Sequence, residues 1–365
     1  MAVKTKAMVT VEPGRMELRD LELPPIGLDD GLLAVEMCGV CGSDPKIFKN
    51  ASQMYRYPLI LGHEVVGRIA AVGSGAAQRW GVSEGDRVVV EFRFACGHCR
   101  MCLQGHYRHC DANLAYGGPI PASEPPGLWG GYAQHMYLAP QARIHRVADS
   151  LPLEVAVLVC AVLANALRWV RVVGGATIGD TVVIQGAGQQ GLAAVVAARE
   201  AGAACVIVLG LARDEERFAL ARKLGAHYTV AVDREDPVAV VRAATGGTMA
   251  DLVIDVTGAP DAAAVSLNLV RRMGTIVNAG TTSAVAPVPF DTQRIVRWEI
   301  TYRGAYTHDT ASVIPALRLA ESGKYPLGSF ITHRLGLAQA EHALRVVEGA
   351  IPEEYPIKAV LLPTL

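Results

Sequence analysis

The stretch TVVIQGAGQQGLAAVVAAREAGA, residues 181–203, has the pattern of a strand, a tight turn and a helix. A β-branched run comes first, the glycines Gly186, Gly188 and Gly191 follow, and the remainder is rich in alanine. In this spacing the first glycine makes the turn, the second lets the backbone approach a pyrophosphate, and the third packs the helix on the strand. We therefore expect a dinucleotide to bind here.

Further strand and helix signals follow this stretch at regular intervals. Strand-like runs begin at Cys205, Ala250 and Gly274, and residues 221–232 read as a helix end followed by a strand. This alternation predicts an α/β fold with a doubly wound parallel sheet. The residues predicted to contact the cofactor are Gly186, Gly188, Gln189, Gln190, Gly191, Gly210, Arg213, Arg217, Thr257 and Gly280.

Position 210 bears on the choice between NAD and NADP. NAD-preferring folds of this kind place an acidic residue about 20 residues beyond the glycines, where it holds the ribose hydroxyls. Gly210 stands at that position here, and Arg213 or Arg217 could pair with a 2′-phosphate. Asp214 could instead swing in and restore NAD binding. The pattern slightly favours NADP over NAD.

Length and composition limit the classes of function. A chain of 365 residues predicts two domains, or one domain inserted into another. A formal charge of -1 makes nucleic acid and anionic membranes poor partners. The first residues lack the apolar stretch of a signal peptide, and we expect the most apolar segment, Val155–Leu167, to be too short to span a bilayer. We expect a cytoplasmic protein with reduced cysteines and no membrane partner.

Four of the eight cysteines lie close together in FACGHCRMCLQGHYRHC, residues 94–110. Two-residue gaps let thiolates converge on one ion, and four thiolates complete a tetrahedral zinc site with no open position. Such a site braces a loop and binds no substrate. The predicted ligands are Cys96, Cys99, Cys102 and Cys110, and the histidines that could compete with them are His98, His106 and His109.

A second group of possible ligands lies upstream. Cys41 follows a strand-like run, and His63 and Glu64 begin another. Cysteine and histidine are zinc ligands, and a carboxylate can join them or orient them. Gly62, Gly67 and Gly73 frame the second run. A cysteine and a histidine 22 residues apart are weak evidence for a metal site, and this glycine pattern strengthens it.

Taken together, the glycine-framed His63-Glu64 pair, the four-cysteine loop and the dinucleotide turn resemble the zinc-dependent alcohol and polyol dehydrogenases of the medium-chain dehydrogenase/reductase superfamily. The resemblance covers essentially the whole chain and implies a GroES-like, partly open β-barrel catalytic domain at residues 1–158 and 305–365. It implies a Rossmann domain inserted at residues 159–304. It also implies zinc at a catalytic and a structural site, NADP or NAD, and a homodimer or homotetramer.

The same resemblance assigns roles in moving a hydride between an alcohol, expected to be secondary, and NAD(P)+. Two cysteines and His63 would hold a catalytic zinc whose fourth position stays open. Ser43 would take the first proton from the alcohol, and Lys46 stands where many members place a relay histidine. Asp44 would orient His63.

Cys160 is the one thiol in the region where the family has its remaining ligand, but it departs from the family spacing. It lies 26 residues before Gly186, one more than the family's cysteine and two more than the glutamate of polyol-type members. Without gaps those positions are Ala161 and Val162, which bind no metal. Either the helix is shifted by one residue so that Cys160 reaches the ion, or Glu64 or a water completes the shell.

Other functions stay open at this stage. A zinc-free reductase of activated C=C bonds belongs to the same superfamily, and a non-catalytic nucleotide-binding protein could keep the fold. The Pro- and Gly-rich residues 114–130 are expected to rim the cleft, where Tyr116 and Trp129 could line an apolar pocket or pack at the surface.

Overall fold

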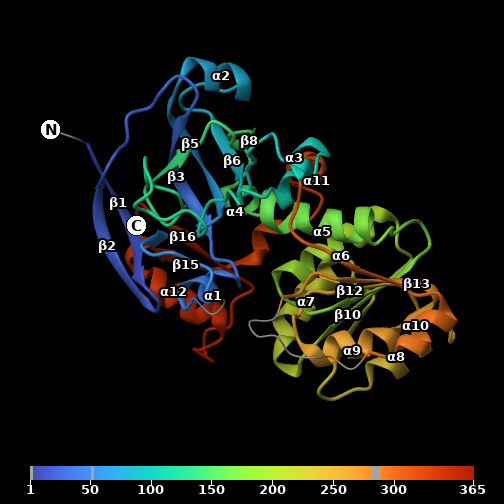
Figure 1. The fold of residues 1–365 in the computed structure, drawn as a ribbon. Coiled ribbons are helices and arrows are strands. Elements are labelled where there is room, and N and C mark those ends of the chain that lie inside the picture. The colour runs from blue at the N-terminus through green and yellow to red at the C-terminus, as the bar shows by residue number, and fades with distance from the viewer. Residues whose placement is uncertain (1–2, 51–52, 282–287, 289) are drawn as a thin grey trace. The chain divides into compact units, whose positions relative to one another are not determined.

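The computed structural model describes residues 3–50, 53–281, 288 and 290–365 (Figure 1). The chain divides into two compact units. The N-terminal unit comprises Met1–Ala161, Asp309–Gly323 and Leu327–Leu365, and the inserted unit comprises Val162–His308 and Lys324–Pro326. The sequence predicted the boundaries after residues 158 and 304.

The N-terminal unit is built on a seven-stranded sheet. Its order is β15 (Ile331–Gly336), β16 (Lys358–Leu362), β3 (Gly31–Gly39), β5 (Glu64–Val72), β6 (Arg87–Glu91) and β8 (Arg143–Arg146), with β7 (His135–Leu138) also paired to β3. A second sheet has the order β2 (Arg15–Glu22), β1 (Lys4–Glu12) and β4 (Leu59–Ile60). Apart from the parallel pair β15–β16, neighbouring strands are antiparallel. Among the described residues neither sheet closes into a barrel.

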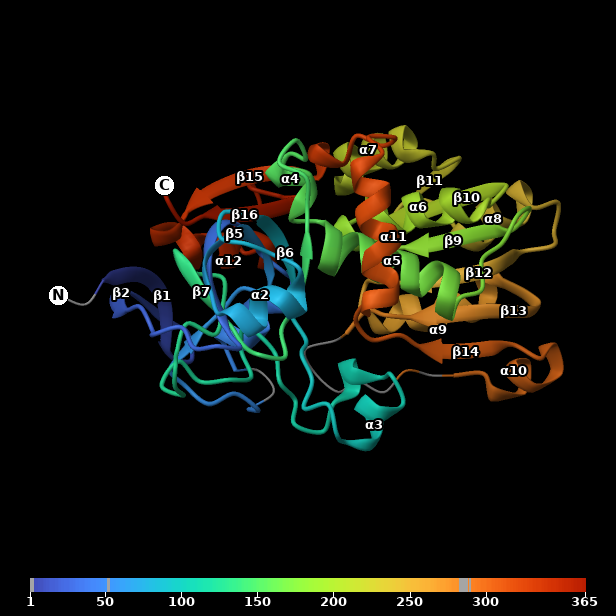
Figure 2. The same cartoon turned by 90° about the horizontal axis from the view of Figure 1, so that it is seen from above.

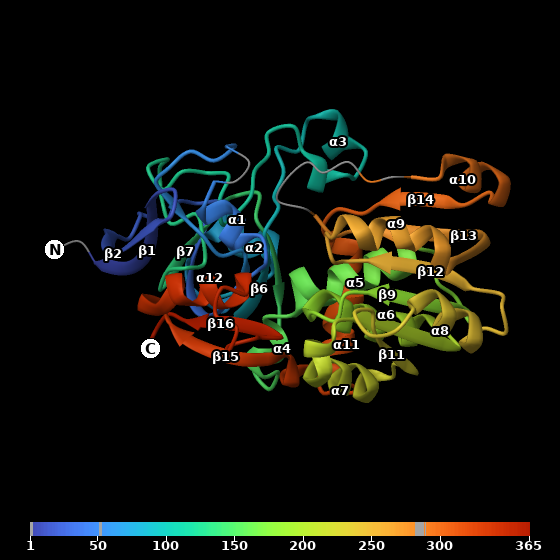
Figure 3. The same cartoon turned by 90° about the horizontal axis from the view of Figure 1, so that it is seen from below.

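Short helices connect and cover these strands, as Figure 3 shows from below. Helix α12, Ala340–Glu348, packs its apolar face on β16, and α11, Thr310–Glu321, is capped by the Asp309 carboxylate, which accepts from the backbone N–H of Ser312. The other helices of this unit are α1 (Asp44–Phe48), α2 (Ser74–Trp80), α3 (Arg100–Leu103) and α4 (Leu153–Ala156).

The inserted unit is a six-stranded parallel sheet. Its order is β11 (Tyr228–Ala231), β10 (Cys205–Gly210), β9 (Thr181–Gln185), β12 (Ala250–Asp255), β13 (Val270–Asn278) and β14 (Thr301–Gly304). The order reverses direction beside β9, which is where doubly wound folds bind dinucleotides. Its helices are α5 (Asn165–Leu167), α6 (Gln189–Ala201), α7 (Glu215–Leu224), α8 (Pro237–Ala244), α9 (Pro260–Leu269) and α10 (Thr292–Trp298). Figure 1 shows α5 and α6 on one side of the sheet and α8 and α9 on the other, and Figure 2 gives the view from above.

A helical run from Leu153 to Val173 differs from the expectation for this region. It includes two π-helical segments, Val159–Ala164 and Arg168–Val173, each with i→i+5 geometry. At 21 residues it is long and apolar enough to cross a membrane, so the expectation that the apolar segment is too short was wrong. Of its most apolar 18-residue stretch, 83% is buried inside the protein, as in the core helix of a globular protein.

Candidate active site and metal centres

Cys41, His63 and Glu64 come together at the ends of two paired strands. Gly39, the last residue of β3, pairs with Glu64, the first residue of β5. The antiparallel register therefore places the loop after β3 beside the start of β5. The Cys41, His63 and Glu64 ligand atoms all lie within 4.8 Å of one another, and His63 and Glu64 are buried.

A carboxylate behind His63 sets the orientation of its ring. His63 Nδ1 lies 3.2 Å from Asp44 Oδ1, and the Asp44 side chain is fully buried. Burial lowers the pKa of His63, but the nearby Asp44 and Cys41 charges raise it, and the net shift is upward. With Nδ1 directed to Asp44, Nε2 is the nitrogen left for a metal.

Glu64 is held on one side by a buried lysine from the end of the chain. Lys358 Nζ contacts Glu64 Oε2 and donates to the Val40 carbonyl at 3.0 Å, and neither charged side chain is exposed. A Cβ on Gly39 would overlap the Glu64 carboxylate, so glycine is required where β3 passes this ion pair. Glu64 Oε1 is buried with no hydrogen-bond partner among the described residues. An unpartnered buried carboxylate oxygen is costly, and a bound cation would satisfy it, so these residues fit a metal ion.

Cys160 lies in the first π-helical segment and is buried. It is not part of the group formed by Cys41, His63 and Glu64. Burial, followed by the charges of Glu91 and Glu64, raises the pKa of its thiol.

Ser43 and Lys46 lie on the first turn beyond Cys41. Ser43 is the N-cap residue of α1, where its carbonyl accepts from the Ile47 N–H at 3.0 Å and its side chain makes no capping bond. Lys46 follows within α1, three residues later, and both side chains are partly exposed. Residues three apart on a helix lie on the same face, so a hydroxyl and an amine are neighbours here.

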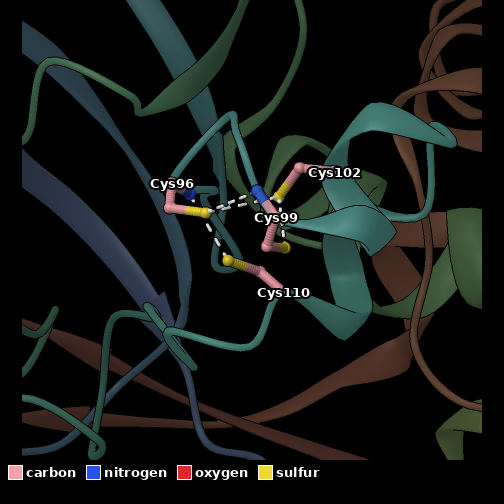
Figure 4. Close-up of side chains that lie close together, drawn as sticks. All are labelled: Cys96, Cys99, Cys102 and Cys110. Carbon is pink, nitrogen blue, oxygen red and sulfur yellow. Dashed lines mark hydrogen bonds between the residues drawn. The ribbon is translucent and has the colours of Figure 1, made fainter.

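The four cysteines of the loop also converge (Figure 4). All four sulfurs lie within 4.8 Å of one another, and all eight cysteines of the chain are free of disulfides. Backbone N–H groups point at the sulfurs: Cys96 N donates to Cys110 Sγ at 3.3 Å, and Cys99 N donates to Cys96 Sγ at 3.4 Å. His98, His106 and His109 do not belong to this group.

The thiols of this loop differ in acidity. Backbone hydrogen bonds from Asp111 and Cys102 lower the pKa of Cys99 to about 6. Burial raises the pKa of Cys102 to about 12. A loop with one stabilised thiolate and neighbouring thiols has the chemistry of a closed zinc site, since zinc binds the deprotonated form.

Tyr107, inside the loop, anchors it to the rest of the N-terminal unit. Its hydroxyl donates to the buried carboxylate of Glu91, and the Thr310 N–H donates to the same hydroxyl at 2.8 Å. Glu91 also accepts from Thr310 Oγ1 at 2.7 Å and lies 2.8 Å from His145 Nε2. The loop is thus tied to the ends of β6 and α11.

The predicted dinucleotide turn has the geometry that its glycines require. Gly186 has φ +109°, and a Cβ on Gly191 would overlap the Gly186 carbonyl. Gly188 is the N-cap residue of α6, with open space where its side chain would be. Gln189 and Gln190 form the first turn of α6. Backbone N–H groups at such a helix start bind phosphates.

Two other predicted cofactor residues lie at neighbouring strand ends. Thr257 follows β12, and the Cβ of a side chain on Gly186 would lie 3.2 Å from Thr257 Cγ2. Gly280 follows β13. It lies so close to Gly258 that a Cβ at position 280 would overlap the Gly258 backbone nitrogen. The carboxyl ends of β9, β12 and β13 thus present these residues together.

Asp214, after the end of β10, is held by hydrogen bonds within its own turn. Asp214 is buried, its Oδ2 accepts from the Leu211 N–H at 2.8 Å, and its Oδ1 pairs with Arg217 Nη1 at 2.9 Å. A Cβ on Gly210 would lie 2.9 Å from the same Oδ2. The carboxylate is thus committed to the turn, and Arg213 is the exposed arginine of this segment.

The comparisons with known proteins agree along the chain. Residues 27–149 match the model of the alcohol dehydrogenase GroES-like domain, and residues 191–322 match that of the zinc-binding dehydrogenase domain. The chain is 42% identical over 366 residues to a probable alcohol dehydrogenase of Mycobacterium tuberculosis, with 98% of each covered. This chain belongs to the zinc-binding alcohol dehydrogenase family.

Solved structures of zinc-type alcohol dehydrogenases share its fold. The alcohol dehydrogenase of Thermotoga maritima has a TM-score of 0.90 and 29% identity, with 99% of both chains covered. A putative zinc-binding dehydrogenase of Sinorhizobium meliloti, bound to NADP, has a TM-score of 0.88 and 26% identity, with 99% of this chain and 100% of that chain covered. The predicted GroES-like and Rossmann architecture is confirmed, and the chain is a dehydrogenase of the zinc and nicotinamide type.

The structure corrects the interpretation of Tyr116 and Trp129 in this dehydrogenase. Both rings are buried. The Trp129 ring stacks on those of Tyr116 and Phe94, and the Tyr116 and Phe94 rings are tilted against each other. The Tyr116 hydroxyl accepts from the Ala139 N–H, and Trp129 Nε1 donates to the Glu124 carbonyl. They belong to the core because their polar atoms find backbone partners there.

Three residues near the metal group were missed from the sequence. Lys358 pairs with Glu64, the Tyr132 hydroxyl donates to Asp44, and the Phe92 ring lies 5.2 Å from the His63 ring between centroids. A lysine inside the apolar strand KAVLL was a usable signal, since a buried lysine needs a partner. Nothing in the sequence pointed to the other two.

Proposed function

We propose that this dehydrogenase oxidises a secondary alcohol to a ketone with NADP+, at a zinc held by Cys41, His63 and Cys160. The proposal rests on one observation above the others: a buried Cys41–His63–Glu64 group in which a carboxylate oxygen has no other partner. When bound, zinc supplies a Lewis acid that favours the alkoxide form of an alcohol. That group favours this reaction over a zinc-free reductase or a non-catalytic protein.

The residues of this chain then divide the remaining work. Asp44 keeps the His63 ring oriented, and the Lys358 ammonium neutralises Glu64 so that one carboxylate oxygen stays available. Ser43 accepts the hydroxyl proton of the alcohol, and Lys46 on the same helix face passes it towards solvent. Hydride transfer itself is the chemistry of the nicotinamide.

The π-helical segment supports Cys160 as the third protein ligand. An α-helix advances by about 100° per residue, so one extra residue turns a side chain to a different face. A π-bulge absorbs one inserted residue within a helix. Cys160 stands one residue farther from Gly186 than the family spacing, and the Val159–Ala164 segment is of the kind that accommodates this extra residue.

The β10 turn supports NADP. Gly210 offers no carboxylate to the ribose, and Asp214 is already bonded to the Leu211 N–H and to Arg217. Arg217 pairs with Asp214, whereas Arg213 is exposed at the start of the turn, and we assign Arg213 to the 2′-phosphate.

A direct assay tests the reaction and the cofactor. Purified protein is incubated with NADP+ or NAD+ and a panel of primary, secondary and polyol alcohols, and the absorbance of reduced nicotinamide is followed. We expect turnover of secondary alcohols with a higher kcat/KM for NADP+. Arg213→Ala should lower kcat/KM for NADP+ about tenfold or more and leave NAD+ unchanged, since a charged hydrogen bond is worth about 1.5–3 kcal/mol. A clear NAD+ preference that Arg213→Ala does not alter would end the NADP assignment.

We also propose a cytoplasmic homodimer or homotetramer. Among the strands that the structure describes, β14 is an edge of the six-stranded sheet, and an edge strand is a surface on which a second copy can pair. Light scattering coupled to size-exclusion chromatography measures the mass of the assembly, and a monomer across the working concentration range would contradict this.

A further inference from the structure

One buried carboxylate, that of Asp44, contacts two of the proposed metal ligands, His63 and Cys41. Asp44 Oδ1 lies 3.2 Å from His63 Nδ1, while Asp44 Oδ2 accepts from the Cys41 backbone N–H at 2.9 Å. Asp44 is not exposed at all, so bulk solvent does not reach its carboxylate. The orientation of both ligands therefore depends on what fixes Asp44.

Tyr132 supplies a side-chain hydrogen bond to this carboxylate. Its hydroxyl donates to Asp44 Oδ2 at 2.9 Å, across 88 residues of sequence. Burial, reinforced by the Asp44 charge, raises the pKa of the phenol, so the hydroxyl stays protonated and remains a donor.

The Tyr132 backbone is held from two sides. The backbone N–H of Tyr132 donates to the Leu61 carbonyl at 2.9 Å, and the Tyr132 carbonyl accepts from the Met8 N–H at 2.8 Å. The ring lies so close to Gly62 that any side chain at position 62 would overlap it. The residue before His63 is thus packed against the ring whose hydroxyl holds the partner of His63.

We propose that Tyr132 is a positioning residue for the catalytic metal: its hydroxyl locks the Asp44 carboxylate, and through it the His63 ring and the Cys41 loop. Without the hydroxyl, the Cys41 N–H is the one partner that Asp44 Oδ2 keeps among the described residues, and the carboxylate can rotate about its side-chain bonds. His63 Nε2 then spends less time in the direction of the metal. This inference rests on the proposed role of His63 as a ligand.

The test uses Tyr132→Phe in the full-length, zinc-loaded enzyme, with Tyr137→Phe as the matched control. Tyr137 is also buried, lies five residues farther along, and donates to a carboxylate, Asp30 Oδ2, at 2.9 Å. Asp30 belongs to neither metal group. Both variants remove one hydroxyl that donates to an aspartate, and only one of these bonds leads to a proposed ligand.

Metal affinity at each site is measured by competition with a chromophoric chelator, and cobalt replaces zinc at the catalytic site for absorption spectra. Partners behind a metal ligand are commonly worth about 10–100-fold in metal affinity. We expect Tyr132→Phe to hold the catalytic metal about tenfold more weakly and to shift the cobalt bands, with the four-cysteine site unchanged. Tyr137→Phe should match the parent enzyme in both.

A double-mutant cycle keeps the inference testable if Tyr132→Phe folds poorly. In an Asp44→Asn background, adding Tyr132→Phe should cause no further loss of metal affinity, because Tyr132 acts on the ligands through the Asp44 carboxylate. Parent-like affinity and spectra in Tyr132→Phe, equal losses in Tyr137→Phe, or additive losses in the cycle would overturn the inference. Failure of the parent enzyme to bind a second zinc would instead reject the ligand assignment beneath it.

Discussion

The four-cysteine loop and the Cys41–His63–Glu64 group both gather possible zinc ligands, but they draw on very different lengths of chain. The loop takes all its ligands from residues 96–110, and backbone N–H groups of the same loop point at the sulfurs. The other group depends on partners as distant as Tyr132 and Lys358. The first site is a local structure, and the second exists only in the folded unit.

This difference has a consequence for what each site can do. Four thiolates leave a zinc ion no open position, so the loop can brace the structure but cannot bind an alcohol. The buried group offers mixed ligands and a carboxylate oxygen without a partner. Replacing one residue at each site should therefore separate activity from stability.

The largest effect is expected for His63→Ala. Lewis-acid catalysis is worth several kcal/mol, and each 1.36 kcal/mol is about tenfold, so kcat/KM should fall at least about a thousandfold. Elemental analysis should show about two zinc ions per chain in the parent and about one in the variant, with thermal unfolding little changed. His98→Ala, an exposed histidine outside both groups, is the control and should stay active. One zinc in a fully active parent would contradict a catalytic zinc.

Lys358→Met tests how strongly the buried group relies on distant partners. Removing one partner of a buried ion pair leaves the other charge unpaired and costs about 3–5 kcal/mol. We expect a lower denaturation midpoint and loss of the catalytic zinc, with the loop zinc retained. Lys49→Met removes an exposed pair with Glu348 in the same unit and should cost about 1 kcal/mol or less. Equal effects of the two substitutions would show that burial of the Lys358–Glu64 pair does not matter.

Cys99→Ser should lower the stability of the fold and largely keep the activity, the reverse of what we expect for His63→Ala. Because the binding free energy of a structural zinc is also folding free energy, opening the loop should cost on the order of 2–4 kcal/mol. Activity per folded molecule should remain close to the parent at low temperature. Cys205→Ser, in β10 and outside both metal groups, serves as the control in thermal unfolding. Loss of activity in Cys99→Ser with unchanged thermal unfolding would mean that the loop does more than stabilise the fold.

The smallest effect concerns thiol reactivity after zinc is removed. The pKa of Cys99 is lowered to about 6, so its thiolate is present above that pH and is lost as the pH falls through it. The pKa of buried Cys160 is raised, so it stays a thiol at neutral pH. Mass spectrometry after brief alkylation at pH 7.5 should find Cys99 labelled about tenfold faster than Cys160, since the thiolate is the nucleophile. Equal labelling would remove this contrast between the sites.

Much of this enzyme could be predicted from short-range pattern. The glycines at 186, 188 and 191 require a tight turn and a close helix, which are local steric demands. The cysteine spacing of the loop likewise needs no distant residue to bring the sulfurs together. The inserted α/β unit followed from alternation of strands and helices, and the comparisons confirm it.

The errors arose where packing decides. Tyr116 and Trp129 lie in a Pro- and Gly-rich segment that resembles a surface rim, yet both rings are buried in the core, where Ala139 outside the segment and Glu124 within it satisfy their polar atoms. The apolar segment Val155–Leu167 was judged too short to span a bilayer, whereas the helical run that contains it extends from Leu153 to Val173 and includes two π-helical segments. Neither outcome can be read from neighbouring residues alone.

The sequence by itself determined which atoms are available for chemistry: the loop thiols, the Cys41 and His63 ligands, and a glycine at 210 in place of an acid. The tertiary structure alone decided which of them are free to act. It commits Asp214 to its own turn, ties one oxygen of Glu64 to Lys358, and places the Tyr132 hydroxyl on Asp44. Hydrogen bonds and ion pairs between distant residues form only when the strands that carry them pair, and burial then makes each such partner matter.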